Sequence, residues 1–162
     1  MTQTRLPEHR PEMLGSPFEI ILVDSVMEND ERTVTIPDMR GMMAGVGMAR
    51  LWRDDRLSGR DLVFLRKSVG FTNEALASAI GVTSADMQGY EGGPRPMTLG
   101  AEKLVRMHLF NALRRLDGPR IDQMINYLEW VLDEWVPTFS QVHDPITIRM
   151  RHHPTGWGEV RG

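Results

Sequence analysis

The chain has 162 residues, of which 41% are hydrophobic and 25% charged, with a formal net charge of −3 and no cysteine. This composition is typical of a soluble globular domain, and no apolar run approaches the roughly 20 residues that cross a bilayer. The lack of cysteine excludes disulfides and cysteine-ligated zinc or iron–sulfur centres. Arg5 and Arg10 are not followed by an apolar core, so we expect no secretory signal and a cytoplasmic location.

The charges are distributed unevenly along the chain. Residues 1–55 carry 6 Lys/Arg and 10 Asp/Glu, residues 56–120 carry 10 and 6, and residues 121–162 carry 3 and 6. The central segment is therefore basic between two acidic flanks. This is the pattern of an embedded nucleic-acid-binding module, because neutralising phosphates supplies most non-specific affinity. A basic surface without a ligand is the alternative interpretation.

The first third of the chain predicts a small β-hairpin followed by a helix. Residues 1–17 are rich in proline and polar groups and are expected to be flexible. The β-branched runs 18–26 and 32–37 flank a polar turn, which predicts a hairpin. Asp38 is a candidate N-cap for a helix over 38–52, with three glycines and, at near-helical spacing, Met39, Met42, Met43, Val46 and Leu51. The hairpin and this helix define a segment over 18–55.

Residues 56–116 show the clearest helical pattern. Ser58, Thr72 and Thr83 are N-cap candidates for three successive helices. Gly81 is placed to adopt the left-handed conformation between the second and third, four residues after the small Ala77. This spacing is that of a helix-turn-helix. The residues expected to face inward are Leu57, Leu62, Leu65, Val69, Leu76, Ala77, Ile80, Met87 and Tyr90.

Two further helices and a tail complete the chain. A helix over 98–116 is expected to end at Asp117-Gly118-Pro119. The segment 117–136 then contains a helix whose apolar residues alternate at four and three positions, which is typical of a packed or coiled helix pair. Its seam either packs on its own domain or forms a homodimer interface, through Ile121, Ile125, Leu128, Leu132 and Trp135. Residues 137–162 read as a tail with one short strand, "ITIRM".

The stretch "FTNEALASAIGVTSADMQGYEGG" (71–93) resembles the lambda-repressor-like helix-turn-helix regulators of the Cro/xenobiotic-response-element type. The longer stretch "RLSGRDLVFLRKSVGFTNEALASAIGVT" (56–83) is similar to an antitoxin-associated group in which a short β-rich segment precedes the helix-turn-helix. Without cysteines, the chain resembles the zinc-free members. The resemblance covers about residues 18–110. It implies a mainly α fold: a five-helix DNA-binding domain with a small N-terminal β-hairpin and an extra C-terminal helix, in the bacterial cytoplasm or nucleoid.

The resemblance also implies which residues meet DNA. In this superfamily the third helix lies in the major groove with its N-terminal side chains against base edges. Asp86 accepts hydrogen bonds only, as from cytosine, and Gly89 offers no side chain, so the predicted reading surface is weak. The base-reading candidates are Ser84, Ala85, Asp86, Gln88 and Gly89. The phosphate-contact candidates are Thr72, Asn73, Thr83, Arg60, Arg66, Lys67, Arg95, Lys103 and Arg106.

Two functions follow from these observations. The first is a sequence-specific regulator of transcription that binds double-stranded DNA as a homodimer, expected to act as a repressor that can control its own operon. The second is a protein-interaction module on the same scaffold, such as an antitoxin-type inhibitor or an adaptor. No enzyme signature and no cofactor motif is present. A metal site is not expected, because His143, Asp144, His152 and His153 lie in the tail.

Overall fold

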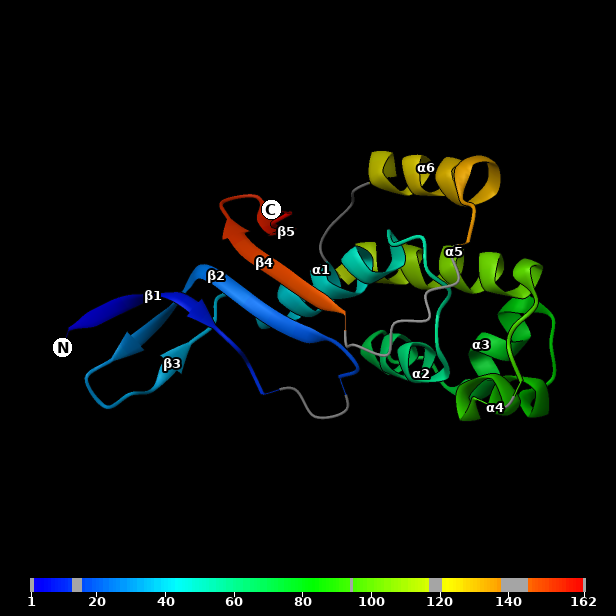
Figure 1. The fold of residues 1–162 in the computed structure, drawn as a ribbon, viewed down its shortest axis with the longest axis horizontal. Helices are drawn as coiled ribbons and strands as arrows, with labels where there is room; N and C mark the ends of the chain where they lie inside the picture. Colours follow the sequence, from blue (N-terminus) through cyan, green and yellow to red (C-terminus); the bar gives the residue numbers. More distant parts are fainter. Residues whose placement is uncertain (1, 13–15, 94, 117–120, 138–145, 162) are drawn as a thin grey trace.

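The computed structural model describes residues 2–12, 16–93, 95–116, 121–137 and 146–161 (Figure 1). Within these ranges the chain forms six α-helices, one π-helical turn and a five-stranded mixed sheet. The fold is therefore α/β, and the prediction of a mainly α fold is wrong. The elements in chain order are β1 (Gln3–His9), β2 (Glu19–Asn29), β3 (Val34–Thr35), α1 (Met39–Leu51), α2 (Gly59–Ser68), α3 (Asn73–Ile80), α4 (Ser84–Gly92), α5 (Leu99–Leu116), α6 (Ile121–Glu129), η1 (Trp130–Glu134), β4 (Thr147–His153) and β5 (Gly156–Glu159).

The sheet joins both ends of the described chain. Its strand order is β1-β2-β4-β5, and β3 pairs with the far end of β2. β2 and β4 are parallel, with Ile20 opposite Ile148, whereas the other pairs are antiparallel. The predicted hairpin thus corresponds to β2 and β3. The strand predicted in the tail corresponds to β4. The flexible segment expected over 1–17 instead contains β1, whose polar sequence lacks the alternation that would have announced a strand.

A bulge bends β2 against the edge strand β1. Leu6 pairs with Val26 and Glu8 with Val23, so β2 has one more residue than β1 in this interval. Asp24 absorbs the extra length with a positive φ of 48°. Pro7 lies opposite the bulge, where its missing N–H removes no regular ladder bond. A proline at this place also makes β1 a poor template for pairing with another strand.

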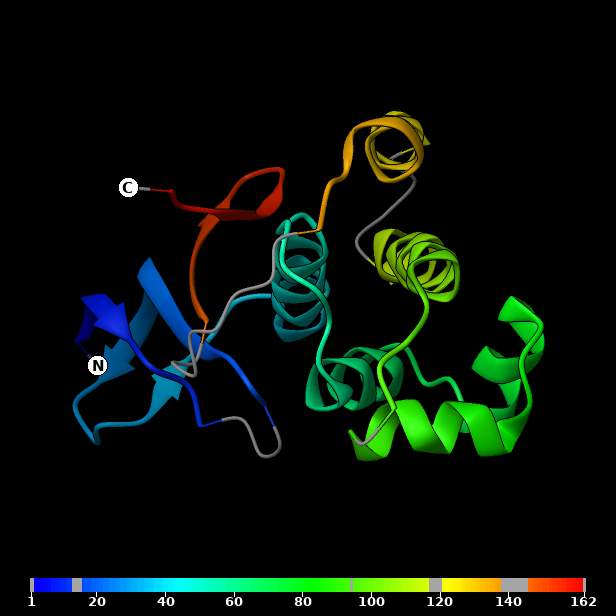
Figure 2. The same cartoon turned by 45° about the vertical axis from the view of Figure 1, so that its right-hand side comes forward.

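Helix α1 is the central element of the core. It packs on β4 and β5 with one face and on α5 and α2 with another, and most of its residues are buried (Figure 2). A Cβ at Gly45 would lie 2.7 Å from Met150 Cε, and one at Gly47 would lie 2.8 Å from Leu113 Cδ1. These glycines weakened the sequence case for the helix. In the fold they allow it to approach its neighbours closely on both sides.

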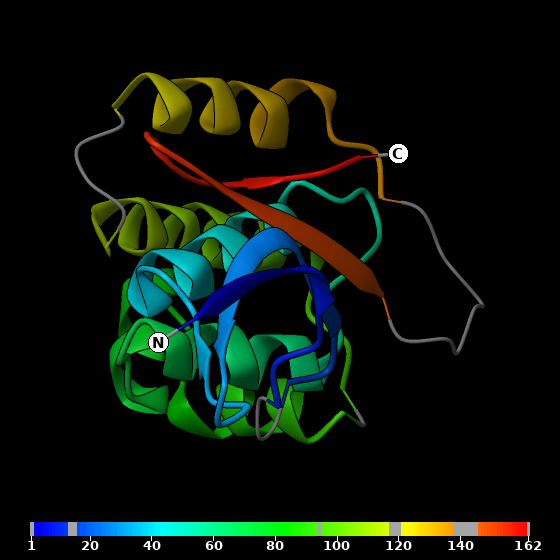
Figure 3. The same ribbon diagram turned by 90° about the vertical axis from the view of Figure 1, so that its left-hand side faces the viewer.

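The helical half agrees with the local sequence signals. The side chains of Asp38, Ser58, Thr72 and Thr83 each accept a hydrogen bond from a backbone N–H, as N-caps do, and Gly81 is left-handed with φ 75°. The residues expected to face inward are buried or partly buried. Figure 3 shows the strands in front of these helices, seen from the sheet side. Among the described residues, no helix is long and apolar enough to cross a membrane.

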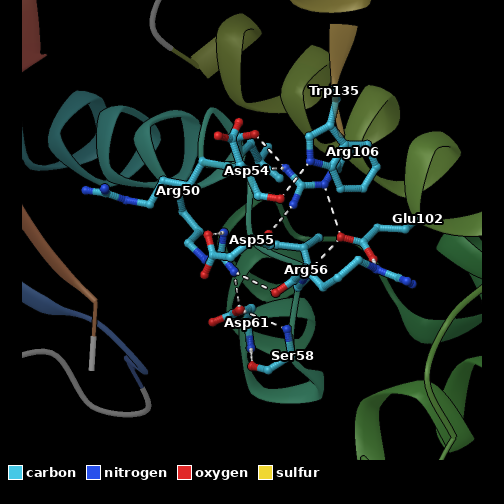
Figure 4. A network of polar contacts seen from close by, with 12 residues as sticks. Arg50, Asp54, Asp55, Arg56, Ser58, Asp61, Glu102, Arg106 and Trp135 are labelled. Atoms are coloured by element: carbon cyan, nitrogen blue, oxygen red, sulfur yellow. Dashed lines mark hydrogen bonds and ion pairs between the residues drawn. The ribbon is translucent and has the colours of Figure 1, made fainter. Parts of the chain in front are cut away.

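The connection between α1 and α2 is held by a buried arginine of α5. Arg106 is fully buried, and its guanidinium donates to the backbone oxygens of Leu51 (2.7 Å), Arg53 (3.2 Å) and Asp55 (2.7 Å) (Figure 4). Its Nε donates to the Glu102 carboxylate at 3.2 Å. Each of the three guanidinium nitrogens thus donates to an acceptor, which is the condition under which a buried cation is tolerated.

Side chains from α6, from the segment after η1 and from α1 complete the same network. Trp135 of the segment after η1 places its ring 4.2 Å from the Arg106 Cζ and donates its Nε1–H to the Asp54 oxygen at 2.8 Å. The Tyr127 hydroxyl of α6 donates to the Leu51 oxygen at 3.0 Å, and burial raises the pKa of this phenol. On the other side Arg50 binds the Asp61 carboxylate at 2.7 Å. The linker between the sheet half and the helix-turn-helix is therefore fixed by α1, α2, α5 and α6 together.

We expect Arg106→Leu to lower the free energy of unfolding by about 3–5 kcal/mol, because it leaves Glu102 buried with one partner fewer. It also removes the arginine donor from the Arg53 and Asp55 oxygens and leaves the Leu51 oxygen with the Tyr127 hydroxyl alone. Urea denaturation followed by circular dichroism measures this loss. The matched control is Arg115→Ala on the same helix, which removes an exposed cation and should change stability by no more than about 0.5 kcal/mol. Equal effects of the two substitutions would contradict this role of the network.

Candidate nucleic-acid interface

Helices α3 and α4 form a helix-turn-helix at the end of the molecule opposite the sheet (Figure 1). The Gly81 conformation ends α3, and the Val82 N–H donates to the Ala77 oxygen at 3.0 Å. Ala77 is buried where the two helices pack, and Met87 anchors α4 in the core. The turn therefore has the geometry that its sequence spacing predicts.

The start of α4 is closed by a capping box. The Thr83 hydroxyl oxygen accepts from the Asp86 N–H at 3.0 Å, and the Asp86 carboxylate accepts from the Thr83 N–H at 3.2 Å. Arg95 donates to the other Asp86 oxygen at 2.8 Å. Hydrogen bonding to Thr83 lowers the pKa of Asp86, with smaller contributions from Arg95. The Asp86 carboxylate thus caps the start of α4, and its ionised form makes these contacts in the folded state.

This commitment changes the list of base-reading candidates. Asp86 stabilises α4, so we interpret it as a cap and no longer as a reader. On the same helix, Ala85 and Gln88 are exposed, and Ser84 is half-buried at the first turn. Gly89 is half-buried beside Arg95, with room for a Cβ at 3.7 Å from Arg95 Cβ. The side chains that α4 can offer to a groove are those of Ser84, Ala85 and Gln88.

The end of α4 is clamped to α2. Arg66 forms an ion pair with Glu91 and donates to the Phe71 oxygen at 2.8 Å. A Cβ at Gly59 would lie 2.5 Å from the Glu91 oxygen, so α2 starts in direct contact with the end of α4. Arg66 therefore holds α4 in place, and its guanidinium is not a free phosphate ligand.

The remaining phosphate candidates divide by their surroundings. Thr72 and Thr83 use their oxygens as caps, which leaves each hydroxyl one hydrogen to donate. The side-chain amide N and O of Asn73 are buried and have no partner within the described residues. Arg60 and Lys67 are exposed and make no ion pair in the described part of the chain. Thr72, Asn73 and Thr83 stand at or beside the N-termini of α3 and α4, where backbone N–H groups favour an anion.

Three other basic candidates have different surroundings from those expected. Arg106 is fully buried in the linker network, so the prediction of a phosphate contact is wrong for it. Lys103 is bound at its Nζ to the Leu132 oxygen at 3.5 Å, which places it beside η1. Arg95 is exposed but paired with Asp86. Burial of Arg106 could not be predicted from the sequence, since arginine in an amphipathic helix is usually solvated.

The predicted dimer seam is split between two faces of α6 and η1. Trp135 is buried over Arg106, Leu128 is partly buried, and Ile125 (52%) and Leu132 (55%) are exposed. The π-helical turn explains the split. The Trp135 N–H donates to the Trp130 oxygen, five residues back, and the extra residue in this turn places the Trp135 side chain on the buried face. The Ile121 side chain lies outside the described part. Homodimerisation through all five residues is therefore not possible in this fold, since Trp135 is already used.

The tail histidines are part of the sheet. His152 belongs to β4, donates its N–H to Ser25 Oγ at 2.8 Å and packs against Trp157. Among the described residues, no group of three or more His, Asp or Glu side chains gathers closely enough to hold a metal ion. His143 and Asp144 lie outside the described ranges.

Comparison of the chain with known family models, curated proteins and solved structures finds no match in any of the three. The geometry of α3 and α4 is therefore the basis for assigning this surface. One feature was visible in the sequence and overlooked: Thr83 and Asp86 have the spacing of a capping box, which already marks the carboxylate as a cap.

Replacing Asp86 with alanine tests whether it is a cap or a reader. We expect Asp86→Ala to lower the thermal midpoint by about 2–4 °C, because the Thr83 N–H loses its acceptor. Differential scanning calorimetry measures the midpoint. Gln88→Ala on the same helix is the control and should leave it unchanged. A midpoint that does not move in Asp86→Ala would return the carboxylate to the base-reading candidates.

Proposed function

We propose that the chain is a sequence-specific regulator of transcription that binds double-stranded DNA through α4 and acts as a dimeric repressor. The observation that carries the proposal is the exposed surface of the helix-turn-helix. Gln88, Ala85 and Ser84 lie on α4 beside two helix N-termini whose capping hydroxyls keep a free hydrogen. Gln88 can bind an adenine edge, and Ala85 fits a thymine methyl group.

Phosphate contacts supply the rest of the affinity in this proposal. The N-termini of α3 and α4 attract anions, and Lys67 and Arg60 add exposed cations. A phosphate oxygen would also give the unpartnered Asn73 amide a hydrogen bond after a change of rotamer, and a buried unsatisfied amide costs about 1–3 kcal/mol. Three reading side chains per subunit give limited discrimination, so a second subunit on a second half-site is needed.

A second candidate function is a protein-interaction module, and one observation favours it. The outer side of α6 and the segment after η1 exposes Ile125, Leu132 and Val136, the last at 75%. Exposed aliphatic side chains of this kind are what a protein partner covers. In the regulator proposal that partner is a second copy of the chain. In the alternative it is another protein, as in an antitoxin.

The experiment that tests the regulator proposal is selection of random duplex DNA by the purified protein at near-physiological salt, followed by sequencing. We expect enrichment of an inverted repeat with half-sites about 10 base pairs apart, centre to centre. Retention without any enriched sequence, lost as salt rises, would overturn sequence-specific regulation.

Substitutions on the two parts of the interface should separate reading from phosphate binding. We expect Gln88→Ala and Ser84→Ala to reduce the preference for the selected site by about 1–3 kcal/mol. Lys67→Ala should weaken all sequences alike and reduce the salt slope by about 1. Fluorescence anisotropy across a salt series measures both quantities. Arg66 is unsuitable as the phosphate probe because its substitution also breaks the pair with Glu91.

The dimer is tested on the two exposed residues of the predicted seam. We expect Ile125→Glu with Leu132→Glu to convert a dimer to a monomer, because two carboxylates would be buried against their copies. Light scattering after size exclusion reports the mass. Arg115→Ala, exposed on α5 and outside the seam, should leave the dimer intact. A wild-type protein that is monomeric at high micromolar concentration would contradict dimerisation and favour the adaptor.

A further inference from the structure

A cavity of about 300 Å³ lies between α1, α6 and the β4–β5 hairpin. Its walls come from three parts of the chain that are distant in sequence: Trp52 follows α1, Phe110 belongs to α5, and Trp157 belongs to β5. Figure 2 shows α1 between the strands and the other helices, where these parts meet. The volume is at the lower end of the range for small-molecule sites.

The apolar walls are rigid. Trp157 donates its Nε1–H to the oxygens of Pro37 (3.0 Å) and Asp38 (3.2 Å), which fixes the ring. Trp52 packs edge-on against Phe110 and Tyr127, with ring centroids 6.0 and 5.0 Å away. Side chains held by several contacts lose little freedom when a ligand binds, so the site is formed before binding.

The polar groups at the cavity are few, and its carboxylate is already paired with two guanidiniums. Gln123 and Asn126 of α6 line it, and neither side-chain amide makes a hydrogen bond within the described residues. Glu159 also lines it, but its two oxygens accept from Arg53 at 2.7 Å and from Arg161 at 3.1 Å. A ligand therefore meets two free amides and a neutralised carboxylate. Neither the apolar walls nor the two neutral amides offer a free counter-charge, so a charged ligand would lose its hydration without compensation.

We propose that this cavity is a binding site for a small, uncharged, planar aromatic molecule that carries a carboxamide or a similar hydrogen-bonding group. The ring lies against Trp52, Phe110 and Trp157, whose faces and edges favour stacked or edge-on aromatic contacts. The polar group pairs with Gln123 and Asn126. The cavity has the volume of about ten liquid water molecules, which suits a bicyclic ring with one substituent. The site is independent of DNA binding.

The ligand joins the two halves of the fold. Its contacts are to α1 and β5 on one side and to α5 and α6 on the other, so it binds the folded chain and not the unfolded one. Binding should therefore raise the unfolding temperature in a concentration-dependent way. This readout is available whatever the chain does to DNA.

The test uses indole-3-carboxamide as the probe, with indole and indole-3-carboxylate as its apolar and charged counterparts. Isothermal titration calorimetry and thermal unfolding of the full chain measure binding. We expect saturable binding of the carboxamide, weaker binding of indole and at least tenfold weaker binding of the carboxylate. Asn126→Phe, at an exposed lining position, should fill the mouth and weaken the carboxamide at least tenfold.

Two further variants make the assignment specific. Gln123→Ala should weaken binding of the carboxamide several-fold and leave binding of indole unchanged, since only the carboxamide group pairs with this side chain. Glu129→Ala, exposed on α6 and outside the lining, should change neither. No saturable binding of carboxamide or indole up to millimolar concentration, or equal binding to wild type and Asn126→Phe, would overturn the proposal.

Discussion

The fold depends on one buried cation. Arg106 reaches from α5 into the connection between α1 and α2 and binds three backbone oxygens there at alternate residues, Leu51, Arg53 and Asp55. A connecting segment has no ladder to satisfy its carbonyls, so it normally lies in water. Here the arginine fork replaces that water, and Glu102 balances its charge. The sheet half and the helix-turn-helix thus share one rigid connection, and the orientation of α4 relative to the sheet is set by it.

Several side chains of the helix-turn-helix are used to stabilise its own helices. Each helix start is capped, α4 is clamped to α2 through Glu91, and Asp86 serves the helix terminus. These contacts fix the position of α4, which a groove-binding helix needs. In the proposed function they leave only Ser84, Ala85 and Gln88 to meet bases. In the proposed function, specificity then comes from pairing two weak readers and from the shape of the DNA between them.

Features that depend on neighbouring residues could be predicted from the sequence, whereas features that depend on residues far apart in the chain could not. N-caps at Ser58, Thr72 and Thr83 and the left-handed Gly81 depend on neighbours within four residues, and each is confirmed. The pairing of β2 with β4 depends on residues 128 positions apart, such as Glu19 and Thr147. No local pattern encodes such a pairing, so β4 was expected only as an isolated strand and the α/β class was missed.

The same distinction applies to the candidate site. The scaffold of α3 and α4 was predictable because helix spacing specifies it. The positions of the Arg106 and Trp135 side chains could not be predicted. Burial of an arginine and the extra residue of a π turn depend on the residues that pack against them. The cavity between α1, α6 and β5 could not be anticipated either, since its walls come from three separate stretches.

The parallel pairing of β2 with β4 also fixes an order of events during synthesis. The helices from α2 to α5 make contacts close in sequence, so they can assemble while the ribosome is still adding residues. β2 must wait with its β4-facing edge unpaired until residues 147–150 have left the exit tunnel. During that interval Ile20, Ile21 and Leu22 lack the strand that later pairs with them. The nascent chain is therefore most exposed to aggregation, and to chaperones, just before translation of its sheet is complete.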